Sequence, residues 1–494
     1  MDETQPLLPD PDLACDEAQD EAAGKDFVDF DPAGDAENPM DWPEAYKWGI
    51  VGLLALMAFT VTFTCISVVP VATRIVDDLD GGHASRSASV LLVTIWELGE
   101  AAGPLLIAPL SEMFGRYPVM NAANLLFIAA VVLAALSRSA AAFIGARALT
   151  GLAVASNVLN PAIVGDMFPS EQRGTAMSWI QLAPLIGGAV GPAISGAIAE
   201  TLGWRNVLWM SATLAITCEA VFLTCFRETY KVAILRRRAA RLRRETGDPA
   251  LRTVFDVEGV SRSQKLWEAI TRPFSVLAGS GVLQSLSVFG AVSFAYFYIM
   301  ATTLPDILET LYGLSAAAAG SALISFSIGS LVSVAICNRA LDGIYVRMRD
   351  ANKGVGQPEY RLPLLVFGGF ALPLVASLYG WTARAHLPVP LLIFTVGVMG
   401  ATMLLSFLPL TAYVVDAFGL YAASAMTVVI VTRCLAGTFI PLASERLVDR
   451  FGYGVGLSLI GCFSLLFAPI PALVLRYGPK WRQRSRYTRE AEAS

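Results

Sequence analysis

Residues 48–71 read WGIVGLLALMAFTVTFTCISVVPV, a run of 24 residues without a charged side chain. A helix needs roughly 20 consecutive apolar residues to cross the hydrocarbon core of a bilayer. Further long apolar runs lie at residues 143–161 and 391–414, and polar connections separate the runs. Because 55% of the chain is hydrophobic and only 16% is charged, we predict a membrane protein with many crossings.

The apolar runs predict twelve transmembrane helices, over residues 47–70, 89–110, 118–136, 141–162, 176–198, 206–226, 274–301, 316–337, 364–382, 388–413, 422–446 and 454–475. The even number places both termini on one side of the membrane. If that side is the inside, 27 Lys and Arg residues lie in the inner segments and 7 in the outer ones. The positive-inside rule therefore predicts cytoplasmic termini.

The predicted fold class is an all-α membrane protein with two pseudo-symmetric bundles of six helices. Its parts are a disordered acidic cytoplasmic tail (1–45), an N-terminal bundle (46–226), a basic cytoplasmic linker (227–273), a C-terminal bundle (274–476) and a cytoplasmic tail (477–494). The acidic tail carries fifteen Asp and Glu residues against Lys25 and has no basic stretch followed by an apolar core, so we do not expect a cleavable signal peptide. In the linker, apolar residues such as Val232 and Leu235 lie among arginines. The linker is either an amphipathic helix on the anionic inner leaflet or a solvated connection.

The two halves of the chain repeat each other at an offset of 249 residues. The offset superimposes Gly188 on Gly437, Pro192 on Pro441 and Gly203 on Gly452. Parallel repeats of six helices are one layout of transporters, with the substrate site between the halves near the middle of the membrane. The repeat therefore favours a transporter.

Other classes of protein have little support in the sequence. The seven cysteines are scattered without a CxxC pair, and the two histidines, His83 and His386, lie far apart, so we expect no metal site. No GxxxxGK[ST] motif is present, which disfavours ATP as the energy source. No cluster of His, Ser or Cys suggests an enzyme, and we expect no nucleic-acid partner and no cofactor.

A short inner loop between the second and third predicted helices reads APLSEMFGRYP, residues 108–118. Its acid, Glu112, and its arginine, Arg116, could pair across helix ends in one conformation and separate in another. The alternative is a simple turn, because Gly115 supplies a helix terminus.

Three further motifs accompany this loop: RALTG at 147–151, GDMFPSEQRG at 165–174 and GGAVGPAISG at 187–196. With them, the chain resembles the major facilitator superfamily, and within it the fungal twelve-span drug:proton antiporter group, over about residues 38–486. The resemblance implies a proton-coupled secondary transporter that exports small amphipathic organic molecules (drugs, toxins or secondary metabolites) by alternating access. It also implies a functional monomer in the lipid bilayer, driven by the proton gradient.

The resemblance also assigns roles to residues of this chain. Its gating loop corresponds to Glu112, Gly115 and Arg116, with Asp342 in the second half, and its antiporter motif to Gly187, Gly191, Pro192 and Gly196. Its arginine motif corresponds to Arg147 and Gly151. The sequence departs from the loop motif at Ala108, Met113 and Tyr117, which weakens the charge network expected in the loop. It departs from the arginine motif at Thr150 and from the antiporter motif at Ser195.

Glu97 and Glu100 lie three residues apart within the second predicted helix and hence on one helix face. A carboxylate in hydrocarbon costs a few kcal/mol or more, so it must face a cavity, find a partner or bind a proton. We hypothesise that one of the two glutamates, with Arg147 as partner, couples proton entry to export. The alternative is a structural ion pair that holds the bundle together.

The remaining polar and aromatic residues predicted to line a central substrate cavity are Trp96, Asn157, Asn160, Gln181, Gln284, Tyr296 and Arg433. Mixed aromatic and amide walls suit amphipathic organic substrates. The alternative for each is an interhelical hydrogen bond or an interfacial anchor. Arg433 aligns with Pro184 in the repeat, and the sequence does not identify its partner.

Two other functions keep the same fold: a proton-coupled importer or uniporter of a small metabolite, and a membrane sensor that does not transport. We expect the plasma membrane as the location. The stretch ETQPLL, residues 3–8, fits an acidic dileucine sorting signal and makes a vacuolar or endosomal membrane the alternative.

Overall fold

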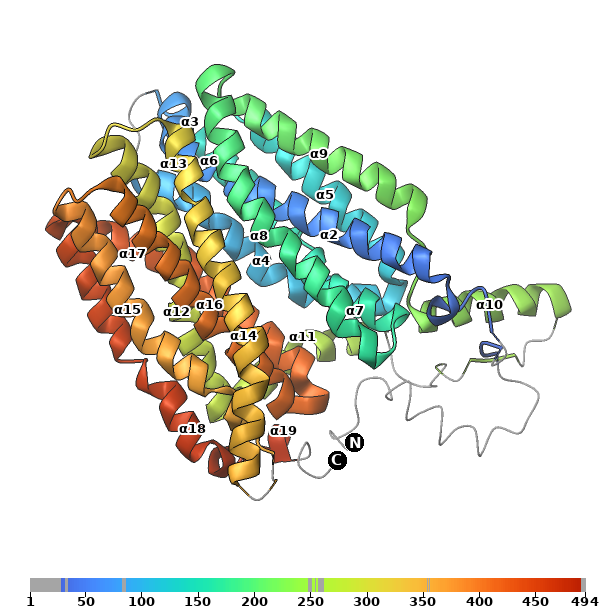
Figure 1. Ribbon diagram of the computed structural model, residues 1–494. Coiled ribbons are helices and arrows are strands. Elements are labelled where there is room, and N and C mark those ends of the chain that lie inside the picture. Colours follow the sequence, from blue (N-terminus) through green and yellow to red (C-terminus); the bar gives the residue numbers. More distant parts are fainter. Residues whose placement is uncertain are drawn as a thin grey trace.

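The computed structural model describes residues 28–31, 34–81, 86–247, 251–253, 255, 262–352, 354 and 356–489. The N-terminal half contains α2 (Glu44–Ile66), α3 (Ala72–Leu79), α4 (Arg86–Phe114), α5 (Arg116–Leu136), α6 (Ala140–Leu152), α7 (Ser156–Met167), α8 (Ser170–Thr201) and α9 (Trp204–Cys225). The C-terminal half contains α12 (Gly281–Thr310), α13 (Ala316–Ala322), α14 (Ile324–Ala351), α15 (Pro363–Arg384), α16 (Val389–Phe418), α17 (Ala422–Leu465) and α18 (Pro469–Arg482). The halves lie side by side, blue to green and yellow to red in Figure 1.

Among the described residues, ten helical segments are long and apolar enough to cross a membrane. One of them, Ala422–Arg482, has 61 residues and would measure about 90 Å if straight, three times the hydrocarbon thickness. It folds back at Gly452, which has φ 75°, and so provides two crossings. The shorter apolar α6 continues into α7 as a further crossing. The twelve-helix fold predicted from the sequence is confirmed.

The turns of the two halves follow the predicted repeat. Gly203, between α8 and α9, has φ 87°, and its counterpart Gly452 has φ 75°. Side chains are strongly disfavoured at such φ values, whereas glycine adopts them without steric cost. The same local chemistry therefore ends the fifth and the eleventh crossing.

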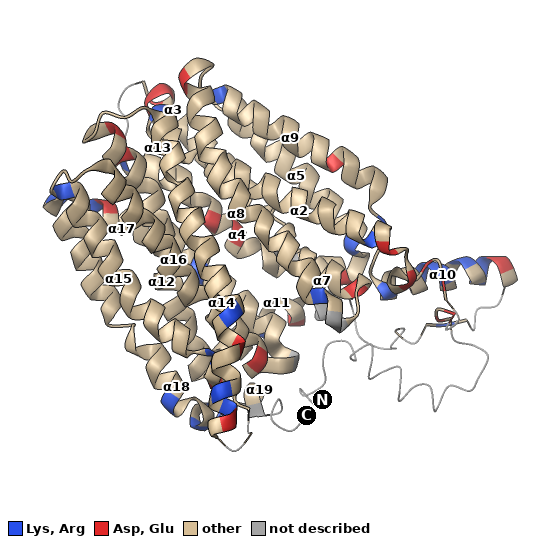
Figure 2. Cartoon of the chain, viewed as in Figure 1, with Lys and Arg blue, Asp and Glu red and all other residues tan. Residues whose placement is uncertain are grey.

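The two ends of the bundle differ in charge. Three short amphipathic or basic helices, α10 (Lys231–Thr246), α11 (Arg262–Gly279) and α19 (Arg486–Arg489), lie at one end, here called the inner end. Lys and Arg residues gather there, on α10 and near the ends of α14 and α18 (Figure 2). The opposite end, which holds Arg86, Gly203 and Gly452, is the outer end.

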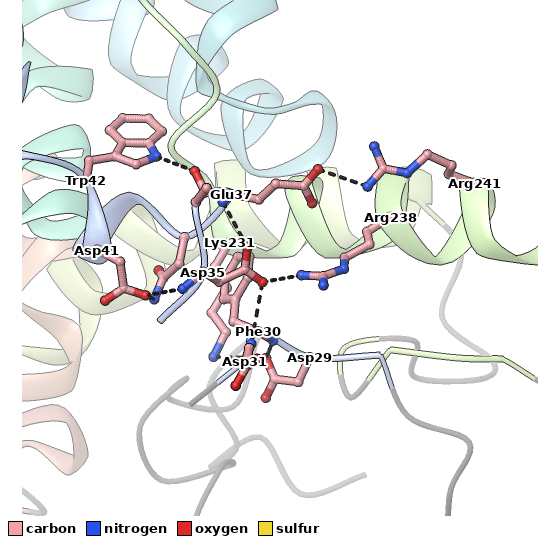
Figure 3. Close-up of polar contacts among 12 residues, drawn as sticks. Asp29, Phe30, Asp31, Asp35, Glu37, Asp41, Trp42, Lys231, Arg238 and Arg241 are labelled. Atoms are coloured by element: carbon pink, nitrogen blue, oxygen red, sulfur yellow. Dashed lines mark hydrogen bonds and ion pairs between the residues drawn. The ribbon is translucent and has the colours of Figure 1, made fainter. Parts of the chain in front are cut away.

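Part of the acidic N-terminal segment is ordered against α10. The Asp35 carboxylate pairs with Arg238, Glu37 pairs with Arg241 at 2.9 Å, and the Trp42 indole donates a hydrogen bond to a nearby carbonyl (Figure 3). The predicted disorder of residues 1–45 therefore does not extend to residues 34–45, because their carboxylates find arginines. The first 27 residues, including the possible dileucine signal, lie outside the described residues.

The apolar face of α10 is covered by the chain itself. Val232 and Leu235 are buried against Tyr230 and Phe255, and Phe30 packs on the same cluster. Helix α10 is therefore docked on the protein, which is neither of the two alternatives for the linker, because its apolar residues are covered and are not free to enter a membrane surface.

The contact between Asp35 and α10 predicts a charge-dependent docking of the N-terminal segment. The pKa of Asp35 is lowered, first by a hydrogen bond from the backbone of Glu37 and second by the hydrogen bond from Arg238. The contact therefore stabilises the fold above the ordinary pKa of 3.8, and this stabilisation is lost as the pH falls through the lowered pKa. We expect Asp35→Asn, at pH 7, to speed proteolysis between residues 28 and 42, while Asp77→Asn, an exposed acid on α3 at the outer end, has no effect. Equal cleavage in all three proteins would contradict this docking.

Helices α4 and α6 cross at two glycines. A Cβ atom at Gly151 would overlap the backbone carbonyl of Trp96, and one at Gly99 would overlap the carbonyl of Ala148. Close backbone approach at small residues is a common form of packing in membranes. This crossing sets the position of α4 beside the fourth transmembrane segment.

We therefore expect Gly151→Ala to destabilise the protein by roughly 1–3 kcal/mol, because the backbones must move apart. Gly145→Ala is the matched control on the same helix, since a Cβ there meets open space. The measurement is the thermal midpoint of the purified protein in detergent. The crossing is not critical if both variants melt like the wild type.

Candidate functional site at the seam between the two halves

Two acidic side chains are buried in the middle of α4. Glu97 and Glu100 are 1% and 2% exposed, and Glu100 lies 14 residues, or about 21 Å, from each end of the helix. Helix α4 packs against α12 and α17 of the C-terminal half. The two carboxylates therefore lie near the predicted midplane of the membrane, at the seam where the halves meet.

Glu100 forms an ion pair across this seam. The guanidinium of Arg433, on α17, donates to its carboxylate at 3.0 Å. Phe294 and Phe407 contribute cation–π contacts to Arg433, with ring centroids 4.6 and 5.6 Å from the guanidinium carbon. The partner of Arg433 that the sequence left open is thus a carboxylate 333 residues away in the other half.

Glu97 receives a different partner from the C-terminal half. The Tyr298 hydroxyl, on α12, donates to one of its carboxylate oxygens at 2.7 Å, and the other oxygen has no hydrogen-bond partner among the described residues. Carboxylate oxygens of Glu97 and Glu100 and the Cys434 sulfur lie within 4.8 Å of one another. These donors could in principle hold a metal ion, but the guanidinium of Arg433 already supplies a cation here. We call these five residues the central cluster: Glu97, Glu100, Tyr298, Arg433 and Cys434.

Arg147 is placed differently from the sequence-based hypothesis. Its side chain is 1% exposed, and it donates hydrogen bonds to the carbonyls of Cys65 at 2.9 Å and of Thr64 and Leu92 at 3.5 Å. The expected pairing of Arg147 with a glutamate is corrected, since the arginine bound to Glu100 is Arg433. Arg147 instead ties the end of α2 to α4, because carbonyls near a helix end need donors.

The glycines of the 187–196 motif serve two packing contacts. Cβ atoms at Gly187 and Gly191 would press on the backbone of α2, within the N-terminal half. A Cβ at Gly196 would overlap the carbonyl of Ala316 on α13, across the seam, and Gly320 approaches the Pro192 carbonyl in the same way. The motif therefore lets α8 touch both halves, and its last glycine lies at the outer end.

Comparison with known proteins decides the family. Residues 51–441 match the sequence profile of the Major Facilitator Superfamily. The chain belongs to the major facilitator superfamily. It is 34% identical over 473 residues to the efflux pump radE of Floropilus chiversii, covering 95% of this chain and 87% of that one. It is 32% identical to the MFS transporter cpaT of Aspergillus oryzae, covering 93% and 92%.

Solved structures of the superfamily share the fold. The xylose transporter XylE from E. coli, in a partially occluded inward open conformation, matches with a TM-score of 0.64 at 16% identity, over 88% of this chain and 98% of that one. A bacterial homologue of the human lysosomal transporter Spinster, inward-facing, also gives 0.64, at 13% identity, over 90% and 99%. The chain is thus a multi-pass membrane protein and a secondary transporter of a small molecule, and not an enzyme.

The inner loop of this transporter forms a network within the N-terminal half. Gly115, at φ 104°, directly precedes α5, and the backbone N–H of Arg116 donates to Glu228 at 2.8 Å. The Arg116 guanidinium pairs with Asp166 at 3.3 Å and stacks over Tyr230 at 4.5 Å. Burial raises the pKa of Tyr230 to about 12, so this ring stays neutral. Glu112 is exposed at the inner end of α4.

The C-terminal half carries a corresponding network. Asp342, on α14, accepts a hydrogen bond from Arg361 at 3.0 Å, and Arg361 also pairs with Asp416. Asp416 is the counterpart of Asp166 in the repeat, offset by 250 residues. Of the predicted gating residues, Arg116 and Asp342 therefore belong to two separate networks, one at the inner end of each half.

The predicted cavity residues divide into two groups. Trp96 and Asn160 are buried, and the Trp96 indole N–H and the Asn160 amide oxygen have no hydrogen-bond partner among the described residues. Gln181 is exposed on α8. The side chain of Asn157 lies outside the described part of the chain.

Gln284 and Tyr296 do not join the central cluster. Gln284 lies near the inner end of α12 and donates to the carbonyl of Leu277 at 3.0 Å. Tyr296 donates to the Ser464 hydroxyl at 2.8 Å, within the C-terminal half. Tyr298 and Cys434 occupy the seam instead. In the sequence, Tyr298 stands out by its place in an aromatic run and Cys434 by its place next to Arg433. Neither feature predicts which face of its helix turns toward the seam.

The central ion pair predicts a strong energetic coupling. Arg433→Met leaves Glu100 buried without this guanidinium and should cost roughly 3–5 kcal/mol of unfolding free energy. The double variant Glu100→Gln, Arg433→Met should lose less than the sum of the two single variants. The measurement is denaturation in mixed detergent micelles, and additive losses would argue against the pair.

Proposed function

We propose that this protein is a proton-coupled exporter of small amphipathic organic molecules, in which Glu97 carries the proton. The observation that carries the proposal is the Glu97 carboxylate, which is buried at the seam beside the Glu100–Arg433 pair and has one oxygen without a partner among the described residues. The direction rests on the relatives, of which one is named an efflux pump.

The charge balance of the central cluster supports a proton on Glu97. Two carboxylates against one guanidinium leave one negative charge, and such a charge is costly at the middle of a membrane. Carboxylates this close do not both ionise readily. The guanidinium of Arg433 balances one carboxylate, that of Glu100, so a proton on Glu97 makes the cluster neutral.

Coupling follows from the position of the cluster between two moving halves. While the seam is closed around Glu97, its proton is held by burial and by the neighbouring carboxylate. When α4 separates from α12 and α17, water reaches Glu97 and the proton can leave. Separation toward one side of the membrane and then the other would exchange protons between the two compartments.

The aromatic residues around Arg433 support an organic substrate. The ring centroids of Phe297 and Phe407 lie 6.3 and 6.0 Å from that of Phe294. All three side chains are partly exposed. Aromatic walls with one polar centre bind flat, amphipathic molecules by burying their apolar faces. This surface makes drugs, toxins or secondary metabolites the expected class.

We further propose the plasma membrane as the site of export, with the inner end in the cytoplasm. The Lys and Arg residues at that end support the orientation through the positive-inside rule (Figure 2). A vacuolar membrane with the same orientation is the alternative, and tagging the full chain and imaging it distinguishes the two.

Substitution of single acids tests the proposal. The chain is expressed in a fungal strain without its own exporters, and a compound panel identifies a transported compound by resistance. Inside-out vesicles then report uptake of that compound under an imposed pH gradient. We expect Glu97→Gln to lose at least tenfold in gradient-driven uptake but to retain exchange of labelled for unlabelled compound, because only the proton step is removed.

Glu219→Gln is the matched control, since Glu219 is another buried acid but pairs with Asn124 inside the N-terminal half at 2.7 Å. Full gradient-driven activity in both Glu97→Gln and Glu100→Gln would reject proton coupling at this cluster. Gradient-driven transport toward the cytoplasm would make the protein an importer.

A further inference from the structure

The outer end of the seam holds a second inter-half cluster, which no motif identifies. Arg86, the first residue of α4, pairs with Asp306 on α12 and with Asp449 on α17. The Tyr453 hydroxyl accepts a hydrogen bond from Arg86 at 3.1 Å and donates one to Asp306. One guanidinium from the N-terminal half thus joins two helices of the C-terminal half, which uses the planar fork of arginine.

The position of this cluster is distinctive among the ion pairs. Between described residues, the ion pairs that join the two halves are those of Arg86 at the outer end and that of Arg433 with Glu100 in the middle. At the inner end, the ion pairs of Arg116 and Arg361 stay within one half. The charges therefore hold the halves together from the middle to the outer end.

Contacts between α4 and α17 continue between the two clusters. Thr438 donates to the carbonyl of Thr94 at 3.3 Å, and Gly437 lies directly beside Glu97. On the other side of the outer end, Glu200 of α8 accepts a hydrogen bond from the backbone of Ala317 on α13 at 3.0 Å. The outer half of the seam is closed along its length.

The two clusters occupy the same three helices. Helix α4 carries Arg86 and the two glutamates, α12 carries Asp306 and Tyr298, and α17 carries Asp449 and Arg433. Along α4, Arg86 and Glu100 are separated by 14 residues, or about 21 Å. A rigid separation of these helices that opens a path from the outside to the central cluster must therefore first break the outer cluster.

We propose that Arg86, with Asp306, Asp449 and Tyr453, is the outer latch of this transporter. The latch stabilises the state in which the outer end is closed, and its opening is required before the central cluster meets the outer compartment. Arg86 acts by positioning helices and touches no substrate. The inference rests on alternating access by a secondary transporter, and on neither the proton coupling nor the direction proposed above.

Hydrogen–deuterium exchange of the full-length protein in detergent tests the latch. Arg86→Ala should raise the outward-open population by roughly fivefold, the size expected for two partly exposed ion pairs. Exchange should then increase in residues 86–94 and 441–452 and decrease at the inner ends of α8 and α14, which close together. Arg86→Lys should shift the population less than Arg86→Ala, because the ammonium keeps the charge. It should still differ from the wild type, because an ammonium lacks the fork that spans two carboxylates.

Arg205→Ala is the matched control, because Arg205 pairs with Asp78 at 2.9 Å at the outer end but within the N-terminal half. Asp449→Asn, which keeps the side-chain shape, is the second variant and should give a smaller shift in the same direction. Unchanged exchange in Arg86→Ala would overturn the proposal. So would an increase at the outer end without protection at the inner end, which would indicate local fraying of α4. Because no substrate or proton gradient is used, this test can fail or succeed independently of the Glu97→Gln experiment.

Discussion

The structure depends on one constraint: two carboxylates in the middle of a transmembrane helix must be neutralised without help from water. Side chains that bind the two carboxylates lie in the other half of the molecule. Arg433 binds Glu100 at 3.0 Å and Tyr298 binds Glu97 at 2.7 Å. Both acids therefore bind side chains across the seam in this state, and these contacts tie the two halves together.

This constraint determines which contacts of the seam are costly to break when the two halves separate. Apolar helix surfaces separate in a membrane at little hydrophobic cost, because lipid is as apolar as the helices. Polar contacts such as the central cluster and the outer latch are different, since breaking them exposes charge that water or a proton must then satisfy. Concentrating them on α4, α12 and α17 confines the costly step of the transport cycle to one three-helix contact, while the glycine contacts of α8 with α13 guide the opposite side of the outer end.

Much of the fold could be predicted from the sequence. The hydropathy pattern and the 249-residue offset determine twelve helices in two repeats, and Gly203 and Gly452 adopt the same left-handed turn. Glu97 and Glu100 stood out because burying a carboxylate is costly wherever it occurs. The docking of residues 34–45 on α10 was missed, because an acidic composition indicates disorder only when no basic surface lies within reach.

The partners of the site residues could not be predicted, for a geometric reason. Residues two apart on a helix point about 200° apart, so a small rotation decides whether Tyr296 or Tyr298 faces the seam. Likewise, Arg147 and Arg433 both lie within predicted transmembrane helices, and the sequence does not tell them apart. Only the packing of the halves places one beside helix-end carbonyls and the other beside Glu100.

The central claim is that Glu97 holds the proton while Glu100 is ionised. Infrared difference spectroscopy detects the C=O stretch of a protonated carboxyl group directly, and a Glu219→Gln background removes the other buried acid of the N-terminal half. We expect a protonated-carboxyl band in this background that disappears on adding Glu97→Gln and persists on adding Glu100→Gln. A band that persists without Glu97 and disappears without Glu100 would contradict the account.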